Sequence, residues 1–490
     1  MLTKTLSAAL SGIDALPVDI EVNATGQGEQ SIVSIVGLPD AAVKESRERV
    51  RSALRACGYV HPAGSTLVNL APADIKKEGA GFDLPIALGM IAATGAIPRE
   101  SLASFLAVGE LALDGTVRPA KGILPIAMLA RESGKVSAMI VPAENVTEAA
   151  IGCRDIPVYG VRSLTEAAAA VSGGLEIFRA PPGEALFAEP DWSGIPDFAD
   201  VKGQTVAKRA LEISAAGGHN SLMIGAPGCG KSMLAQRLPG ILPPMTIEET
   251  LEISRIHSTV GLLSSSSPLL KARPFRAPHH TISDAGLLGG GINPSPGEIS
   301  MAHNGVLFLD ELPEFKRNVL EVLRQPLENG SVSVCRAAGS FIFPSRFILV
   351  AAMNPCPCGY YGDNQRVCRC NPPQIQRYRA RISGPLLDRI DLHVELGALK
   401  EHELVNAPTG ENSAKIRERV VAARTRQTSR YKGTKIHSNA QMEPAHLQNF
   451  CGIDHKSEML LRHAIREFNL SARAYDRILR VARTIADLED

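Results

Sequence analysis

The segment SLMIGAPGCGKSMLA, residues 221–235, constrains the fold of this chain more than any other stretch. Its apolar start, Ser221 to Ile224, predicts a short strand, and the run SMLAQRL after the glycines predicts a helix. Between them, residues 225–232 spell G-x-x-x-x-G-K-S, the pattern of a phosphate-binding loop. The complete motif between a strand and a helix predicts an α/β domain with a parallel sheet that binds a nucleoside triphosphate.

Each part of this loop has a chemical reason. Glycines let backbone N–H groups turn toward a phosphate, and the start of the helix adds partial positive charge. We expect the Lys231 amine to reach the β- and γ-phosphates of ATP and the Ser232 hydroxyl to ligate Mg²⁺. The residues predicted to hold the nucleotide are Gly225, Ala226, Pro227, Gly228, Cys229, Gly230, Lys231, Ser232 and Met233.

An acidic pair follows a second predicted strand. In NGVLFLDELPEF, the buried run Val306 to Leu309 ends in Asp310 and Glu311. A carboxylate at this point can hold Mg²⁺, and a second one can polarise the attacking water. We assign Asp310 to the metal and Glu311 to the general base; ordinary capping of a strand end is the alternative explanation.

Two further polar residues end predicted elements downstream. RFILVAAMNP predicts a strand that ends in Asn354, whose amide can orient the attacking water, although an Asn before Pro355 also favours a turn. SGPLLDRIDLHVEL places Arg389 at the end of a helix-like segment, where it can reach a neighbouring subunit's nucleotide. Pairing with Asp388 or Asp391 on the surface is the alternative for Arg389.

The chain has room for more than one domain. Its 490 residues predict two to four domains, and its net charge of +1 means that any basic surface is local. We expect an α+β domain at residues 1–177, a linker rich in Pro, Gly and acidic residues at 178–199, the nucleotide-binding core at 200–400, and a helical region at 401–490.

Targeting signals and cysteine usage predict a cytoplasmic protein. The beginning of the chain lacks the clean apolar stretch of a signal peptide. The longest apolar run, Leu84 to Ile97, is too short to span a bilayer and predicts a buried core helix. Nine cysteines, an odd number, favour reduced thiols.

Four segments together carry a family resemblance: GAPGCGKS, VLFLDELPEF, AAMNPCPCGY and SGPLLDRIDLH. With them the chain resembles, over essentially its whole length, the ComM (YifB-like) family of magnesium-chelatase-like AAA+ ATPases. The resemblance implies Asn354 as sensor 1, Arg389 as an arginine finger supplied in trans, and Arg473 as sensor 2 in cis. It also implies a C-terminal helical lid, docked by an apolar stripe formed by Ile478, Val481, Ala482, Ile485 and Leu488.

The N-terminal region resembles the Lon-protease-like fold (ribosomal S5 domain 2-like). In that fold the proteases carry a Ser–Lys dyad. Here the serine position falls on Gly81 and the lysine position on Leu124, so peptide hydrolysis by that route has neither nucleophile nor base. We expect a binding or assembly module.

Two segments are candidates for binding DNA. The resemblance places residues 271–305, between the two nucleotide motifs, in the pore of a ring. Two β-like runs around Ala338 and Gly339 predict a hairpin. Basic side chains there suit a phosphate backbone, although packing between subunits is the alternative. The candidate residues are Lys271, Arg273, Arg276, His279, His280 and Arg336.

The resemblance implies a ring-shaped, hexameric DNA translocase or helicase that is driven by ATP. Such a motor would promote branch migration in homologous recombination during natural transformation, on single-stranded or branched DNA, without membrane association. A protein-remodelling motor of the magnesium-chelatase type is the alternative. A non-enzymatic scaffold with ATP as assembly switch is a third, disfavoured by the intact acidic pair and Arg389.

The stretch NPCPCGYYGDNQRVCRCNP contains two Cys-x-Cys pairs: Cys356, Cys358, Cys368 and Cys370. Four thiolates suit tetrahedral Zn²⁺, and the intervening GYYGD predicts a turn that can bring the pairs together. Structural zinc, free thiols and a redox switch all remain open. A catalytic metal is not expected, because no ligand position would be left open.

Overall fold

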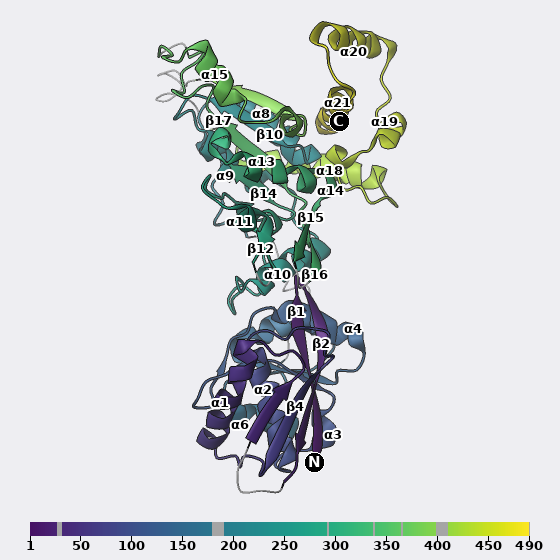
Figure 1. Cartoon of the computed structure of the whole chain (residues 1–490). Helices are drawn as coiled ribbons and strands as arrows, with labels where there is room; N and C mark the ends of the chain where they lie inside the picture. Colours follow the sequence, from purple (N-terminus) through teal and green to yellow (C-terminus); the bar gives the residue numbers. More distant parts are fainter. Residues whose placement is uncertain are drawn as a thin grey trace. The chain divides into compact units, whose positions relative to one another are not determined.

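The computed structural model describes residues 1–26, 32–178, 191–291, 294–336, 339–363, 366–397 and 410–489 (Figure 1). The chain separates into two compact units. The first combines Met1–Ala188 with Ile247–Leu270, and the second combines Glu189–Thr246 with Lys271–Asp490. Most of the expected linker at 178–199 lies outside the described residues, as does the expected boundary near residue 400.

The first unit is built on a mixed seven-stranded sheet of order β3-β4-β2-β1-β5-β8-β9. Strand β1 pairs antiparallel with β2 and parallel with β5, so both hairpin and crossover connections occur. The strands are β1 (Leu2–Ser11), β2 (Asp14–Ala24), β3 (Ile32–Val36), β4 (Ser65–Ala71), β5 (Phe105–Ala107), β8 (Ala138–Pro142) and β9 (Val158–Val161). A separate short ribbon joins β6 (Glu110–Leu111) and β7 (Val117–Arg118).

Two hydrophobic clusters form the core of this unit. One includes residues of α1, α2 and α6, and the other includes residues of α4 and α5. Every residue of α2 is buried, which confirms the core helix predicted from the apolar run. The helices are α1 (Ala41–Ala56), α2 (Asp83–Ala93), α3 (Arg99–Leu102), α4 (Ile123–Ser133), α5 (Val146–Cys153) and α6 (Leu164–Val171), with 3-10 turns η1 (Ala80–Phe82) and η2 (Ala143–Asn145).

Helix α10 (Ile247–Thr259) belongs to the first unit, although the sequence places it inside the nucleotide-binding region. The Ser258 hydroxyl donates to Oε1 of Glu148 at 2.5 Å, and the Leu124 N–H donates to the same oxygen at 3.0 Å. Leu269 completes a buried cluster with Leu124 and Ile151. The expected 200–400 core is therefore interrupted at 247–270, because this segment buries its apolar side chains in the first unit.

The second unit contains a five-stranded sheet of order β11-β14-β17-β10-β18 in which every pairing is parallel. This confirms the predicted parallel sheet. Strand β17 lies between β10 and β14, so the ends of these three strands are neighbours. The strands are β10 (Ser221–Gly225), β11 (Phe275–Arg276), β14 (Val306–Leu309), β17 (Ile348–Met353) and β18 (Leu392–Leu396).

Several further elements belong to the second unit. Strands β15 (Ser331–Arg336) and β16 (Gly339–Pro344) pair antiparallel, which confirms the predicted hairpin. Strands β12 (Gly289–Gly290) and β13 (Ser295–Pro296) form another small ribbon. The helices are α8 (Thr205–Gly217), α9 (Lys231–Arg237), α11 (Asp284–Leu288), α12 (Glu298–Met301), α13 (Arg317–Val322), α14 (Arg324–Asn329), α15 (Pro372–Arg379) and α16 (Gly384–Leu387), with η3 (Phe198–Asp200), η4 (Leu238–Ile241) and η5 (Leu312–Glu314).

The C-terminal part is helical, as expected: α18 (Ser413–Arg430), η6 (Asn439–Gln441), α19 (Pro444–Phe450), α20 (His455–Phe468) and α21 (Ala472–Glu489) (Figure 1). Polar contacts tie α21 to the sheet. The buried His219 ring lies 2.8 Å from the Thr484 hydroxyl through Nε2 and 3.1 Å from Asp391 through Nδ1. Leu488 packs against the core cluster of the sheet.

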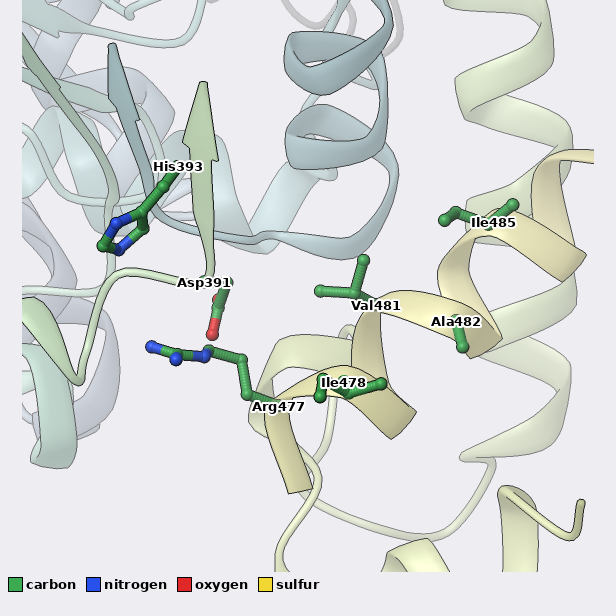
Figure 2. A pocket seen from close by; sticks show the side chains of 7 residues that line it. All are labelled: Asp391, His393, Arg477, Ile478, Val481, Ala482 and Ile485. Carbon is green, nitrogen blue, oxygen red and sulfur yellow. The ribbon is translucent and has the colours of Figure 1, made fainter. Parts of the chain in front are cut away.

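The rest of the predicted apolar stripe does not close onto the core. Ile478, Val481, Ala482 and Ile485 instead line a cavity of about 420 Å³, together with Asp391, His393 and Arg477 (Figure 2). Polar anchors therefore hold α21, and its apolar face is only partly covered in the single chain. Within the described ranges, none of the helices has the length and apolar character needed to cross a bilayer.

Candidate nucleotide-binding site

The phosphate loop, the acidic pair and the end of β17 meet at one edge of the parallel sheet. The Ser232 hydroxyl donates to Oδ2 of Asp310 at 2.6 Å. The Lys231 amine donates to Oδ1 of Asn354 at 3.2 Å. Two neighbouring residues of the phosphate loop thus hydrogen-bond to residues of the two other motifs, because parallel strands end at the same edge.

The loop itself holds a buried cation among oxygen acceptors. Lys231 is only 8% exposed, and its amine also donates to the carbonyls of Gly225 at 2.6 Å and Ala226 at 3.0 Å. Gly228 and Gly230 have φ of +83° and +91°, which glycine adopts without strain. A buried amine beside a hydroxyl and a carboxylate fits a triphosphate with its Mg²⁺, since Mg²⁺ prefers such oxygen ligands.

The second acid of the pair has a different environment. Glu311 has φ of +51°, a conformation that costs energy for a residue with a side chain. Its N–H donates to Oδ1 of Asp310 at 2.9 Å. Its carboxylate oxygen Oε2 lies 3.4 Å from Nδ1 of His280. The turn therefore directs the two acids to different partners, one to Ser232 and the other to His280.

Two residues that the sequence analysis missed support this edge. The Gln204 side chain donates to the carbonyls of Cys229 at 3.1 Å and Gly397 at 2.9 Å, which links the phosphate loop to the end of β18. Tyr378 is buried, which raises its pKa to about 12, and it hydrogen-bonds the backbone of Asn354. No motif surrounds either residue, so only their spatial neighbours identify them.

Arg389 and Arg473 converge on one carboxylate. Arg389 pairs with Glu328 of α14, and Nη2 of Arg473 lies 3.8 Å from the same Glu328 oxygen. The structure thus brings together two arginines that were assigned to different sites, a finger in trans and a sensor in cis. Both roles stay predictions.

Arg477, one helical turn after Arg473, is a further arginine that the sequence could not distinguish. Its Nη1 donates to the carbonyls of Ile390 at 2.9 Å and Asp388 at 3.3 Å. These residues flank Arg389 in the chain, so α21 holds the turn that carries Arg389. Figure 2 shows the Arg477 side chain reaching from α21 toward Asp391.

Two of the DNA-binding candidates are engaged inside the protein. Arg273 donates to the carbonyls of Pro243 at 2.8 Å and Asn304 at 2.7 Å. Arg276 makes a two-pronged pair with Glu298, with distances of 2.6 and 2.7 Å. Such contacts position backbone segments and leave these guanidinium groups poorly available to a phosphate backbone.

The other candidates have different surroundings. Lys271 is exposed. The exposed His279 lies 2.9 Å from the Thr281 hydroxyl, whereas His280 faces Glu311. Arg336 pairs with Gly339 in the backbone register at the end of the hairpin, and its side chain lies outside the described part of the structure.

The four cysteines of the two Cys-x-Cys pairs form one cluster. Their sulfur atoms all lie within 4.8 Å of one another. Cys356 Sγ is 3.4 Å from Cys358 Sγ and 3.7 Å from Cys368 Sγ, and Cys358 Sγ is 3.6 Å from Cys368 Sγ. Tetrahedral zinc with bonds of about 2.3 Å would separate its sulfur ligands by about 3.8 Å, so the cluster fits Zn²⁺.

The local backbone favours a thiolate in this cluster. Hydrogen bonds from the backbone of Arg369 and Tyr360 lower the pKa of Cys358 to about 6. The thiolate is the form of cysteine that binds metal. None of the nine cysteines, which all lie within the described ranges, forms a disulfide bond.

The parallel sheet, the phosphate loop and the acidic pair define a P-loop nucleoside triphosphatase. Three family models match the chain: "Subunit ChlI of Mg-chelatase" at residues 20–145, "Magnesium chelatase, subunit ChlI" at 197–404, and its C-terminal model at 410–490. Competence protein ComM of Haemophilus influenzae is 44% identical over 489 residues, covering 99% of this chain and 93% of the relative.

Two other relatives are informative. YifB of Salmonella typhimurium is 43% identical over 486 residues, 98% of this chain and 92% of YifB. The chloroplastic magnesium-chelatase subunit ChlI of Chlamydomonas reinhardtii is 24% identical over 304 residues, 56% of this chain and 66% of the relative. The chain belongs to the YifB/ComM family of magnesium-chelatase-like AAA+ proteins. Membership implies ATPase activity with ATP and Mg²⁺.

Proposed function

We propose that the protein is an ATP-driven, ring-shaped DNA translocase that promotes branch migration during homologous recombination in natural transformation. The convergence of Lys231, Ser232, Asp310 and Asn354 at one sheet edge supports the hydrolysis half of this proposal. The near-full-length similarity to a competence protein supports the DNA half.

The residues at the sheet edge have distinct roles in the proposed reaction. Lys231 would bind the β- and γ-phosphates, and Ser232 and Asp310 would hold Mg²⁺, which would supply positive charge beside the phosphates. Glu311 accepts the proton of the attacking water, and Asn354 orients that water. The hydrogen bonds among Lys231, Asn354, Ser232 and Asp310 support this assignment, because they position the groups before substrate arrives.

The arginine finger requires assembly. In the proposed hexamer, Arg389 acts on the nucleotide of the neighbouring subunit. Within its own chain Arg389 pairs with Glu328, which holds the guanidinium in a defined place. Arg477 supports the same turn through the flanking carbonyls.

Fewer residues are proposed to contact DNA than the sequence alone indicated. Lys271, His279 and Arg336 remain candidates for phosphate contacts. Arg273 and Arg276 act instead as internal supports, because protein oxygens already occupy their donors. His280 fits neither the group of candidate phosphate contacts nor the group of internal supports, because its ring faces Glu311.

The remaining parts have proposed supporting roles. Residues 1–177 form a Lon-protease-like binding or assembly module, in which Gly81 and Leu124 occupy the positions of the protease dyad. Residues 401–490 act as the lid of the AAA+ core. The four cysteines bind a structural Zn²⁺, as their sulfur–sulfur distances favour.

One experiment tests the proposal as a whole. ATP hydrolysis is measured with the full chain, with and without single-stranded or branched DNA, followed by strand displacement on a labelled fork and a four-way junction. We expect DNA to stimulate hydrolysis and labelled strands to be released. Hydrolysis that DNA leaves unchanged, without strand release, would contradict a DNA motor and favour a protein-remodelling motor like the ChlI relatives.

A further inference from the structure

The cysteine cluster lies next to the nucleotide site in the chain. Cys356 follows Asn354 after a single residue, Pro355. Arg379 of α15 donates to the Pro355 carbonyl at 3.2 Å, which holds the peptide between Asn354 and the cluster. A displacement of the cluster would therefore be transmitted to the end of β17.

The loop inside the cluster also packs directly on the phosphate loop. Gly359 has φ of +87°, and its N–H donates to the Cys356 carbonyl at 2.9 Å. A Cβ atom at Gly359 would lie 2.6 Å from Cδ and 2.8 Å from Cγ of Pro227. Glycine is needed here because its backbone occupies the space against the Pro227 ring that a side chain would fill.

From these contacts we infer that metal bound by the four cysteines holds the Gly359 turn against Pro227, so that metal occupancy sets the affinity of the phosphate loop for nucleotide. This inference rests on the proposed ATP site and the proposed zinc site. It adds a coupling between the two sites. The metal would hold the two cysteine pairs together at the ends of the Gly359 turn, and this turn would limit the movement of the phosphate loop.

Two glycines of the same turn provide a matched test. Gly362 has φ of +79°, so alanine there meets the same kind of backbone strain, but a Cβ atom at Gly362 has no atom within 4 Å. Gly359→Ala and Gly362→Ala thus differ mainly in the contact with Pro227. Both variants keep all four thiols.

Zinc content and nucleotide affinity are measured separately on the full chain. Zinc per chain is determined by mass spectrometry of the purified protein, and the Kd for a fluorescent ATP analogue with Mg²⁺ is determined by anisotropy. We expect one zinc per chain in wild type and in both variants. Gly359→Ala should raise the Kd on the order of tenfold, because overpacking displaces the loop, and Gly362→Ala should leave it within about twofold.

A second arm needs no substitution at the turn. A zinc-selective chelator in excess Mg²⁺ should remove the metal from wild type and raise the Kd in step with zinc loss, and Cys368→Ser should behave alike. This arm decides the question if Gly359→Ala does not fold, as judged by circular dichroism.

The outcomes are distinguishable. Wild type without zinc overturns the metal site and the coupling with it. If zinc is present but its removal leaves the Kd for the ATP analogue unchanged, the coupling alone is overturned. A wild type that binds no ATP analogue contradicts the proposed ATP site. Because this measurement contains no DNA, failure of the proposed DNA motor would leave its result unchanged.

Discussion

Nδ1 of His280 lies 3.4 Å from Oε2 of Glu311, the proposed general base. His280 follows strand β11 in the segment between the two nucleotide motifs, where the DNA contacts were expected. The contact joins the proposed catalytic carboxylate to the segment that the motor would use to sense its substrate. A ligand that moves this segment would change the freedom of Glu311 to act as a base.

This relationship predicts the effect of His280→Ala. Removal of the ring should release Glu311 and raise DNA-independent ATP hydrolysis by about fivefold, with a correspondingly smaller stimulation by DNA. His279→Ala is the matched control, because His279 contacts Thr281 rather than Glu311. Equal basal rates in His280→Ala and wild type would show that the contact does not restrain the base.

Mixing of two inactive variants tests the arginine finger. Lys231→Ala lacks a working phosphate loop, and Arg389→Ala alone should lose hydrolysis about a thousandfold or more. In mixed rings, an Arg389→Ala subunit can receive Arg389 from a Lys231→Ala neighbour. We therefore expect hydrolysis to recover on mixing; two variants that stay inactive together would exclude action in trans.

The same mixing experiment decides the role of Arg473. The sensor role implied for Arg473 places it at the nucleotide of its own subunit, so Arg473→Ala mixed with Lys231→Ala should stay inactive while Arg389→Ala recovers in parallel. Recovery of Arg473→Ala would instead place Arg473, like Arg389, at the nucleotide of the neighbouring subunit, as their shared contact with Glu328 allows.

The stability of the first unit should depend on residues 247–270, which lie between the two nucleotide motifs in the sequence. Leu269 is 2% exposed and packs with Leu124 and Ile151, so Leu269→Ala should lower the free energy of unfolding of this unit by about 2–5 kcal/mol. Leu262 lies in the same segment but is 58% exposed, so it provides the control. Leu262→Ala should change the free energy of unfolding little. Similar denaturation curves for both variants would argue against the assignment of 247–270 to this unit.

The C-terminal helices should lose stability in acid. Burial by itself raises the pKa of Asp487, but hydrogen bonds from Arg430 and Asn439 outweigh it and hold the pKa below its ordinary value of 3.8. A depressed pKa means that the carboxylate stabilises the fold fully above the ordinary value, and that this contribution is lost as pH falls through the folded value.

Thermal unfolding followed by circular dichroism at pH values from about 5 to about 3 measures this effect. Asp487→Asn should unfold at a lower temperature near neutral pH and should lose less stability on acidification than wild type. Parallel losses in both proteins would assign the acid sensitivity to other groups.

Much of the second unit could be predicted because its signals are local. The apolar runs that became β14 and β17 are followed directly by Asp310 and Asn354, and the run that became β10 leads into the glycine loop before Lys231. The parallel pairing of these strands brings the three residues to one edge. The hairpin β15–β16 was also visible in its two β-like runs. In contrast, the pattern of α10 indicates only a helix with a buried face and carries no information on which unit buries it.

The sequence by itself determined the nucleotide chemistry, because a phosphate loop is made by consecutive residues whose own backbone and side chains form the site. It also predicted that the four cysteines come together, since two close pairs joined by a turn can meet. Only the tertiary structure decided that His280 faces Glu311, that Arg389 shares Glu328 with Arg473, and that Gly359 packs on Pro227. Each of these contacts joins separate elements, and periodicity along a chain does not specify which distant groups come together.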